Sequence, residues 1–229
     1  MHDWWLDERT TAGDEHLDPG YVDGYDARAG YDPRPDVDAL VARGLGPGSR
    51  LLDLGAGTGT FAFAAAETGA SVTAVDVSPA MVASMRDRAA REAAAITVVE
   101  AGFLSYAHVG PPVDFVFTRN ALHQLPDVWK AVALVRVAAT MRTGAILRLL
   151  DLVYDSTIDD LDTVVGNWMA GAVDDPAQGY TADDLATHVR TEHSTFTWLL
   201  EPVLERAGFE ILERDVRKSV YATYTCRRH

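Results

Sequence analysis

Three glycines and two acidic residues are spaced like the parts of a nucleoside pocket. Gly55, Gly57 and Gly59 stand at every second position after an apolar run. That run carries Asp53, and a second apolar run ends at Asp76. Glycine lets backbone N–H groups approach a ligand where a strand turns into a helix. Because a carboxylate that ends the next strand can accept hydrogen bonds from both ribose hydroxyls, the pattern predicts a nucleoside-binding pocket.

The spacing of the glycines distinguishes two kinds of nucleotide-binding turn. In the dinucleotide fingerprint G-x-G-x-x-G the third glycine comes one residue later than Gly59 does here. With Asp53 before the first glycine, the pattern D-x-G-x-G-x-G resembles the first motif of class I S-adenosylmethionine (SAM)-dependent methyltransferases. The resemblance extends from about Tyr21 to the C-terminus. An NAD-dependent oxidoreductase is a weaker alternative, because the glycine spacing opposes it.

The resemblance implies how SAM would be held. SAM has no phosphate, so the glycines would let its amino-acid end lie against bare backbone. An acid near Asp53 suits the ammonium or sulfonium side, directly or through water, and Asp76 maps to the acid that holds the ribose. The candidate cofactor-binding residues are Asp53, Gly55, Gly57, Thr58, Asp76, Val77, Met81, Gly102, Phe103, Asn120, Arg28 and Tyr25.

The adenine end departs from the family pattern at one position. After the third strand the family often has an acid that faces the adenine amine, followed by an apolar or aromatic residue. Here Gly102 stands in place of the acid and Phe103 follows it. We therefore expect the backbone of Phe103 to hold adenine without the usual carboxylate. Packing in the protein core is the alternative for Phe103 and for Met81.

A histidine follows the fourth predicted strand. Residues 118–127 resemble the fourth methyltransferase motif and, within the family, the small-molecule branch that includes the ubiquinone and menaquinone methyltransferases. Ala-Leu-His-His is a common form there; this chain has His123 and then Gln124. A neutral imidazole near the transferred methyl group could take a proton from an acceptor hydroxyl or carbon. His123 is the candidate catalytic residue, and a hydrogen bond within the loop is the alternative.

Residues 1–35 are acidic and aromatic, which predicts short covering helices rather than a disordered tail. The family resemblance implies that this segment folds over the cofactor as a cap. The segment looks like the Tyr-Asp-containing part of the same branch. Arg28 could pair with the SAM carboxylate through its planar guanidinium, or it could be a surface arginine. Tyr25 and Tyr31 could line the pocket or fasten the cap, and Tyr31 is a second catalytic candidate.

Other patterns narrow the acceptor to a small molecule. The chain has no Asn/Asp-Pro-Pro-Tyr/Phe sequence, which is typical of base-amine methylation, and no Pro-Cys nucleophile.

His188 and His193 lie beside Glu192, but their spacing does not place two imidazoles on one helix face. We therefore predict no metal site.

Composition excludes several classes of protein. The chain has 229 residues, a formal net charge of −14 and one cysteine, Cys226. Such an acidic surface repels phosphate backbones and anionic membranes, so nucleic acid and membrane are not expected partners. We find no signal peptide, no disulfide pair and no apolar run long enough to span a bilayer, so a cytoplasmic location is expected. The oligomeric state is left open.

Alternating strands and helices must position these residues. Strands are predicted at 51–54, 72–76, 96–100, 113–118 and 145–153, with helices at 60–68, 79–94 and 127–141 between them. Two adjacent strands, 209–217 and 220–226, follow helices near 182–190 and 195–207. We predict an α/β fold: a Rossmann-like, doubly wound, seven-stranded sheet, mostly parallel, with one antiparallel strand near the C-terminus and helices on both faces. Residues 1–35 form a cap, and residues 36–229 form one domain with an insertion at about 155–195.

The expected function is SAM-dependent methyl transfer to a small-molecule acceptor, with oxygen or carbon slightly favoured over nitrogen. A SAM-binding protein that does not methylate, acting as a sensor or a rearrangement catalyst, is the alternative from a different class.

Overall fold

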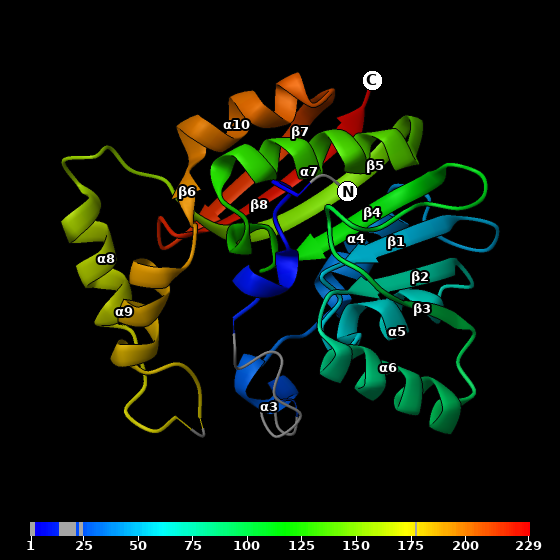
Figure 1. Ribbon diagram of the computed structural model, residues 1–229, viewed down its shortest axis with the longest axis horizontal. Helices are drawn as coiled ribbons and strands as arrows, with labels where there is room; N and C mark the ends of the chain where they lie inside the picture. Colours follow the sequence, from blue (N-terminus) through cyan, green and yellow to red (C-terminus); the bar gives the residue numbers. More distant parts are fainter. Residues whose placement is uncertain (1–2, 14–21, 23–24, 177) are drawn as a thin grey trace.

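The computed structural model describes residues 3–13, 22, 25–176 and 178–229. A twisted sheet runs through the molecule with helices on both of its faces (Figure 1). In the described residues the strand order is β3-β2-β1-β4-β5-β8-β7. The strands are β1 (Arg50–Leu54), β2 (Ser71–Asp76), β3 (Ile96–Glu100), β4 (Val113–Arg119), β5 (Met141–Tyr154), β6 (Thr195–Phe196), β7 (Phe209–Arg217) and β8 (Tyr221–Arg228).

The direction of the strands confirms the predicted fold class. β1 pairs in parallel with β2 and β4, β2 with β3, and β4 with β5. β8 lies antiparallel between β5 and β7, as expected for the C-terminal end of the chain. β6 is a two-residue addition that pairs with the end of β5.

The helices form two layers. They are η1 (Glu8–Thr11), α3 (Tyr25–Ala29), α4 (Arg34–Val41), α5 (Thr60–Ala66), α6 (Pro79–Glu92), η2 (Leu122–Gln124), α7 (Asp127–Thr140), α8 (Leu161–Met169), α9 (Ala182–Thr191) and α10 (Thr197–Arg206). Side chains of β1 alternate between the layers because successive residues of a strand face opposite sides. Leu51 packs with α4, α5 and α6, whereas Leu52 and Leu54 pack with α7 and α10.

Several elements differ from the sequence prediction. The insertion at 155–195, for which only a helix near 182–190 was predicted, also contains helix α8, whose Trp168 is buried in a small cluster with Leu185 of α9. Strand β6 occupies the first two residues of the helix predicted at 195–207. β5 begins at Met141 rather than at residue 145, because α7 ends there and the chain continues directly as a strand beside β4. In the described part of the chain, each helix is too short or too polar to cross a membrane.

Candidate functional site

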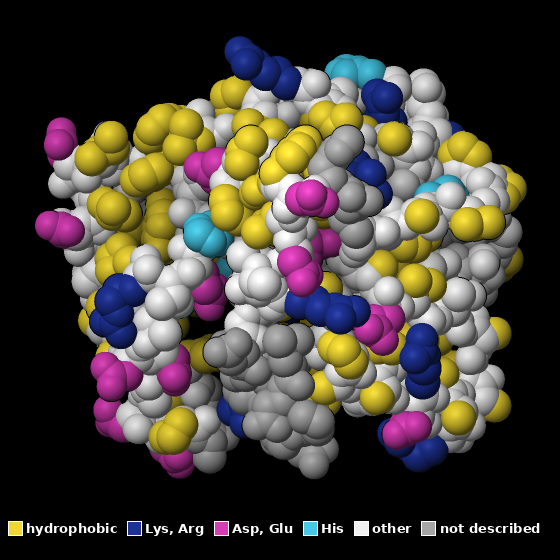
Figure 2. Space-filling model, in the orientation of Figure 1, with side chains coloured by type: hydrophobic (Ala, Val, Ile, Leu, Met, Phe, Trp, Pro, Cys, Tyr) yellow, Lys and Arg dark blue, Asp and Glu magenta, His cyan; other side chains and the backbone are white. Residues whose placement is uncertain are grey.

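Two cavities adjoin at the ends of the central strands. The first lies over the carboxyl ends of β1, β2 and β4 and is lined on its other side by residues of η1 and α3. The second, about 500 Å³ in volume, lies between the loop after β4 and the segment that carries α8 and α9. Tyr25, Asn120 and Gln124 line both cavities. Figure 2 shows a hollow between the α8–α9 segment and the body of the molecule, with a histidine side chain beside it.

Asp76 lies where the nucleoside prediction requires it. It ends β2 and lines the first cavity, and its two oxygens accept N–H groups from Gly57 and Ser78, each at an N···O distance of 2.8 Å. Burial raises the pKa of this carboxyl to about 6, although these backbone donors favour the charged form. Asp76 is therefore ionised at neutral pH and can still accept hydrogen bonds from a ligand.

The glycine turn brings two loops closer together than any side chain would allow. Gly55 has φ +72°, and a Cβ at this position would lie 2.3 Å from the Cβ of Ala121 in the loop after β4. Both the backbone conformation and the close approach therefore require glycine. Gly57 faces the ring of Tyr25, 3.8 Å from where its Cβ would be, so α3 covers the turn.

The structure places a carboxylate from the N-terminal segment at the predicted adenine end of the cavity. Glu8 of η1 reaches over Gly102, and a Cβ on Gly102 would lie 2.3 Å from Glu8 Oε2. Ser105 donates its N–H and its hydroxyl to Glu8 Oε1, at 2.8 and 2.9 Å. Burial raises the pKa of Glu8, and hydrogen bonds from the loop at 103–105 oppose that rise.

Sequence reasoning missed Glu8 because it lies far from Gly102 in the chain. Two signals were present: a glycine where an acid is usual, and an acidic N-terminal segment with no assigned partner. The other predicted adenine contacts, Val77, Met81 and Phe103, line the same cavity as Glu8.

Two predicted cofactor residues are buried and are absent from the described lining of the first cavity. Asp53 lies in β1 beneath the glycine turn, and burial together with the nearby charge of Asp76 raises its pKa well above the usual range. Thr58 is also buried, and its hydroxyl hydrogen-bonds Asp26 of α3. Thr58 therefore fastens α3 to the turn.

Tyr31 and Arg28, two candidates from the N-terminal segment, have different surroundings. The hydroxyl of Tyr31 donates to Asp36 Oδ2 at 2.8 Å, and the guanidinium of Arg119 lies 4.0 Å from the centre of its ring. Burial and the Asp36 charge raise the pKa of Tyr31, so this phenol cannot serve as a base at neutral pH. Arg28 lines the second cavity together with Tyr25. Tyr21 lies outside the described residues.

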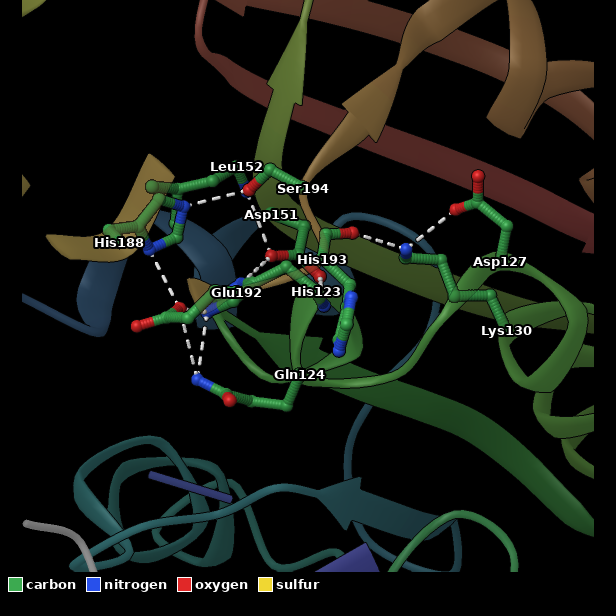
Figure 3. A network of polar contacts seen from close by, with 10 residues as sticks. All are labelled: His123, Gln124, Asp127, Lys130, Asp151, Leu152, His188, Glu192, His193 and Ser194. Carbon is green, nitrogen blue, oxygen red and sulfur yellow. Dashed lines mark hydrogen bonds and ion pairs between the residues drawn. The ribbon is translucent and has the colours of Figure 1, made fainter. Parts of the chain in front are cut away.

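A network of histidines and acids forms one wall of the second cavity (Figure 3). His123 is buried; its Nδ1 contacts Asp151 Oδ1 and its backbone N–H donates to Asp151 Oδ2 at 3.0 Å. Its Nε2 lies 2.8 Å from Glu192 Oε2. The same oxygen lies 2.7 Å from His188 Nδ1 and accepts a 3.1 Å hydrogen bond from Gln124 Nε2.

The carboxylates determine the charge of this network. Burial alone would lower the pKa of His123, but Asp151 and Glu192 outweigh it and raise the pKa to about 9. Burial would raise the pKa of Glu192, yet hydrogen bonds from His123 and His188 hold it well below its usual range. Both ring nitrogens of His123 therefore face carboxylates, and its role as a base stays a prediction.

The neighbouring histidine, His193, supports the network through its backbone N–H and carbonyl groups. Its N–H donates to the carbonyl oxygen of His123 at 2.9 Å, and its own carbonyl accepts a hydrogen bond from the buried Lys130. Lys130 also pairs with Asp127 at 2.8 Å. These contacts hold the chain after α9 against η2 and the start of α7.

Comparisons with known proteins agree with this geometry. Residues 51–144 match the family described as "Methyltransferase domain". Uncharacterized proteins of Mycobacterium tuberculosis and Mycobacterium bovis are 33% identical over 99 residues, which is 43% of this chain and 36% of each relative. The matched part therefore spans little more than a third of those relatives.

Solved structures share the fold at low identity. Magnesium protoporphyrin IX methyltransferase (ChlM) from Synechocystis PCC 6803 with bound SAM is 17% identical over 100% of both chains, with a TM-score of 0.68. The CcbJ methyltransferase from Streptomyces caelestis is 19% identical over 97% of this chain and 99% of its own, with a TM-score of 0.70. The [4+2]-cyclase SpnF is 18% identical over 85% and 80%, with a TM-score of 0.64. The chain thus has the fold of class I SAM-dependent methyltransferases, and residues 51–144 match a methyltransferase domain.

Proposed function

We propose that this protein transfers a methyl group from SAM to a small-molecule acceptor. One observation carries the proposal: a cavity with a glycine turn and a ribose-type acid adjoins a second, larger cavity, and the two share Tyr25, Asn120 and Gln124. A donor and an acceptor bound side by side in these cavities would meet at the shared wall. The volume of the second cavity suits a small organic molecule.

SAM would lie across the ends of the strands. Asp76 would accept the ribose hydroxyls, Met81 and Phe103 would enclose the adenine, and Glu8 would accept its amine. The methionine part would lie along the turn at Gly55 and Gly57, which turns the sulfonium toward the second cavity. In this pose Glu8 replaces the carboxylate that Gly102 lacks.

The protein would accelerate the transfer mainly by alignment. An electron pair of the acceptor attacks the methyl carbon in line, the S–C bond breaks onto sulfur, and the acceptor gives up a proton. Holding both reactants in one dry site supplies the proximity that this reaction needs. Residues 1–35 would act as the cap over SAM, and residues 155–195 as an insertion that closes the acceptor side.

His123 would orient the acceptor rather than act as a free base. Its two nitrogens are already bound to carboxylates, which fixes the ring at the wall of the second cavity. We favour an oxygen or carbon acceptor, and the loop at 121–124 supports a place near the ubiquinone- and menaquinone-type branch.

The decisive experiment combines SAM binding with product formation. Calorimetry should show one SAM per chain, with no comparable binding of NAD, and incubation with a panel of phenols, quinols and amines should yield S-adenosylhomocysteine with at least one of them. Since a [4+2]-cyclase shares this fold, the fold alone does not specify methyl transfer. SAM that binds but is never consumed across the panel would favour the non-methylating alternative. NAD binding without SAM binding would overturn the proposal.

A further inference from the structure

Three metal-ligand atoms from two separate parts of the chain converge at the wall of the second cavity. They are His123 Nε2, His188 Nδ1 and Glu192 Oε2, and all lie within 4.8 Å of one another. His123 belongs to η2, His188 to α9, and Glu192 follows the end of α9. We propose that this trio binds a divalent transition-metal ion, which in turn holds an oxygen of the methyl acceptor; the acceptor's part in this rests on the proposed function.

The outer nitrogens of both imidazoles are already engaged, as metal-binding histidines require. His123 Nδ1 contacts the buried carboxylate of Asp151, and His188 Nε2 lies 2.8 Å from Ser194 Oγ. Such outer partners fix the ring orientation and make the inner nitrogen a better ligand. Asp151 is itself held, because it accepts the backbone N–H groups of His123 and Leu152 at 3.0 and 2.8 Å.

Packing against neighbouring rings also holds the two imidazoles in place. The ring centroids of His123 and His188 lie 5.0 Å apart, and the ring of Trp168 packs edge-on against His188 at 5.5 Å. Figure 3 shows His188 and Glu192 turned toward each other, with His123 and Gln124 beside them. Both imidazole rings are therefore held by their neighbours, and the carboxylate of Glu192 lies between them.

The adjustment needed is small. Glu192 Oε2 lies 2.7 and 2.8 Å from the two nitrogens. Ligands about 2.0–2.1 Å from a common tetrahedral centre lie about 3.3 Å apart. A shift of the carboxylate by about half an ångström, away from the two rings, would make room for the ion.

The donor set selects the kind of metal. Two imidazoles and one carboxylate suit Zn²⁺, Fe²⁺ or Co²⁺, whereas Mg²⁺ prefers an all-oxygen shell. Three protein ligands leave at least one coordination position open. All three ligand residues line the second cavity, so an acceptor oxygen can reach that position.

A metal here would supply a route to deprotonate an acceptor hydroxyl. A hydroxyl bound to a divalent metal loses its proton near neutral pH, so that no free base is needed. The proton passes to water, the oxygen electron pair forms the bond to the methyl carbon, and the S–C bond breaks onto sulfur. The products are a methyl ether and S-adenosylhomocysteine.

The test is direct metal binding by the whole chain. Protein stripped with EDTA is titrated with ZnSO₄ by calorimetry and with CoCl₂ by visible absorption, which reports coordination by nitrogen ligands. The wild type should bind one Zn²⁺ with a dissociation constant below about 1 μM. Ser194→Ala should weaken binding about tenfold through the orientation of His188, and His188→Ala should abolish it. Glu192→Gln, which keeps the shape of the side chain, should weaken binding strongly.

His108→Ala is the matched control, because that imidazole contacts Tyr106 and the Pro111 carbonyl away from this cluster and should bind zinc like the wild type. Equal zinc affinity in the wild type and His188→Ala, with both folded by circular dichroism, would overturn the inference. SAM calorimetry on the same stripped samples separates the two proposals. SAM binding without zinc binding defeats only the metal site, and zinc binding without SAM binding defeats only the proposed function.

Discussion

The two cavities are built in different ways although they share a wall. The first is built around backbone: a glycine turn, strand ends and the N–H groups that bind Asp76, with side chains from η1, α3 and the loops after β3 and β4 around them. The second is formed by large side chains from β5, α8, α9 and β8, including Trp168, His188 and Tyr221. Backbone geometry tolerates little substitution, whereas side chains can be exchanged one at a time. The difference explains how one fold can keep one cofactor and serve many acceptors.

Among changes to the first cavity, a substitution in the glycine turn should have the largest effect on stability and SAM binding. Gly55→Ala forces a side chain to φ +72° and into Ala121, so we expect unfolding stability to fall by about 2–5 kcal/mol and SAM binding to be lost. Gly48→Ala is the control, because Gly48 has φ +86° but open space around it, and it should cost about 1–2 kcal/mol. Urea denaturation measures both. Equal losses would show that the close approach to Ala121 is unimportant.

Asp76→Ala should weaken SAM binding by about 1–3 kcal/mol, roughly 5- to 150-fold, because charged hydrogen bonds to the ribose are lost. Calorimetry gives the affinity. Asp87→Ala, on the exposed side of α6, should leave it unchanged. An unaltered affinity in Asp76→Ala would defeat the ribose assignment.

SAM affinity should depend on pH through Asp76. The ionised carboxylate is the better acceptor, so affinity should be constant above about pH 7 and fall up to tenfold per unit below pH 6. The folding stability of the free protein should depend on pH in the opposite direction. The folded pKa is raised above the unfolded one, so this group's contribution to stability is complete below about pH 4 and is lost as the pH rises through about 6. Asp76→Asn should remove both dependences, and a flat wild-type affinity from pH 5 to 8 would contradict them.

Glu8 and Gly102 offer a reciprocal test of the adenine contact. Glu8→Ala should weaken SAM binding by about 1 kcal/mol. Gly102→Asp should also weaken it, because the new side chain meets the Glu8 carboxylate. The double variant should recover most of the affinity, since the acid then stands where the family usually has it. Additive losses in the double variant would show that Glu8 does not replace that acid.

Changes in the second cavity should affect SAM binding least. His123→Ala should alter SAM affinity less than twofold while lowering turnover with the true acceptor, because His123 lines the second cavity and is absent from the described lining of the first. Calorimetry and single-turnover assays measure the two quantities. A normal rate would leave His123 with a structural role, and a large loss of SAM affinity would mean that the cavities do not function separately.

The sequence by itself determined the alternation of strands and helices, the glycine turn and the position of Asp76 at the end of a strand. These features follow from local periodicity and from turn chemistry within a short stretch of chain. Residues 155–179 were harder to assign, because α8 is stabilised by packing Trp168 against α9 rather than by a local pattern.

Only the tertiary structure decided which distant side chains meet. Glu8 reaches Gly102, and His123 meets His188 and Glu192, because η1 and α9 fold against the loops after β3 and β4. It also placed three predicted residues outside the described lining of the first cavity: Asp53 and Thr58 are buried, and Tyr31 donates a hydrogen bond to Asp36. Spacing along a chain reports neighbours within one turn or strand, whereas a site assembled from separate elements depends on their packing.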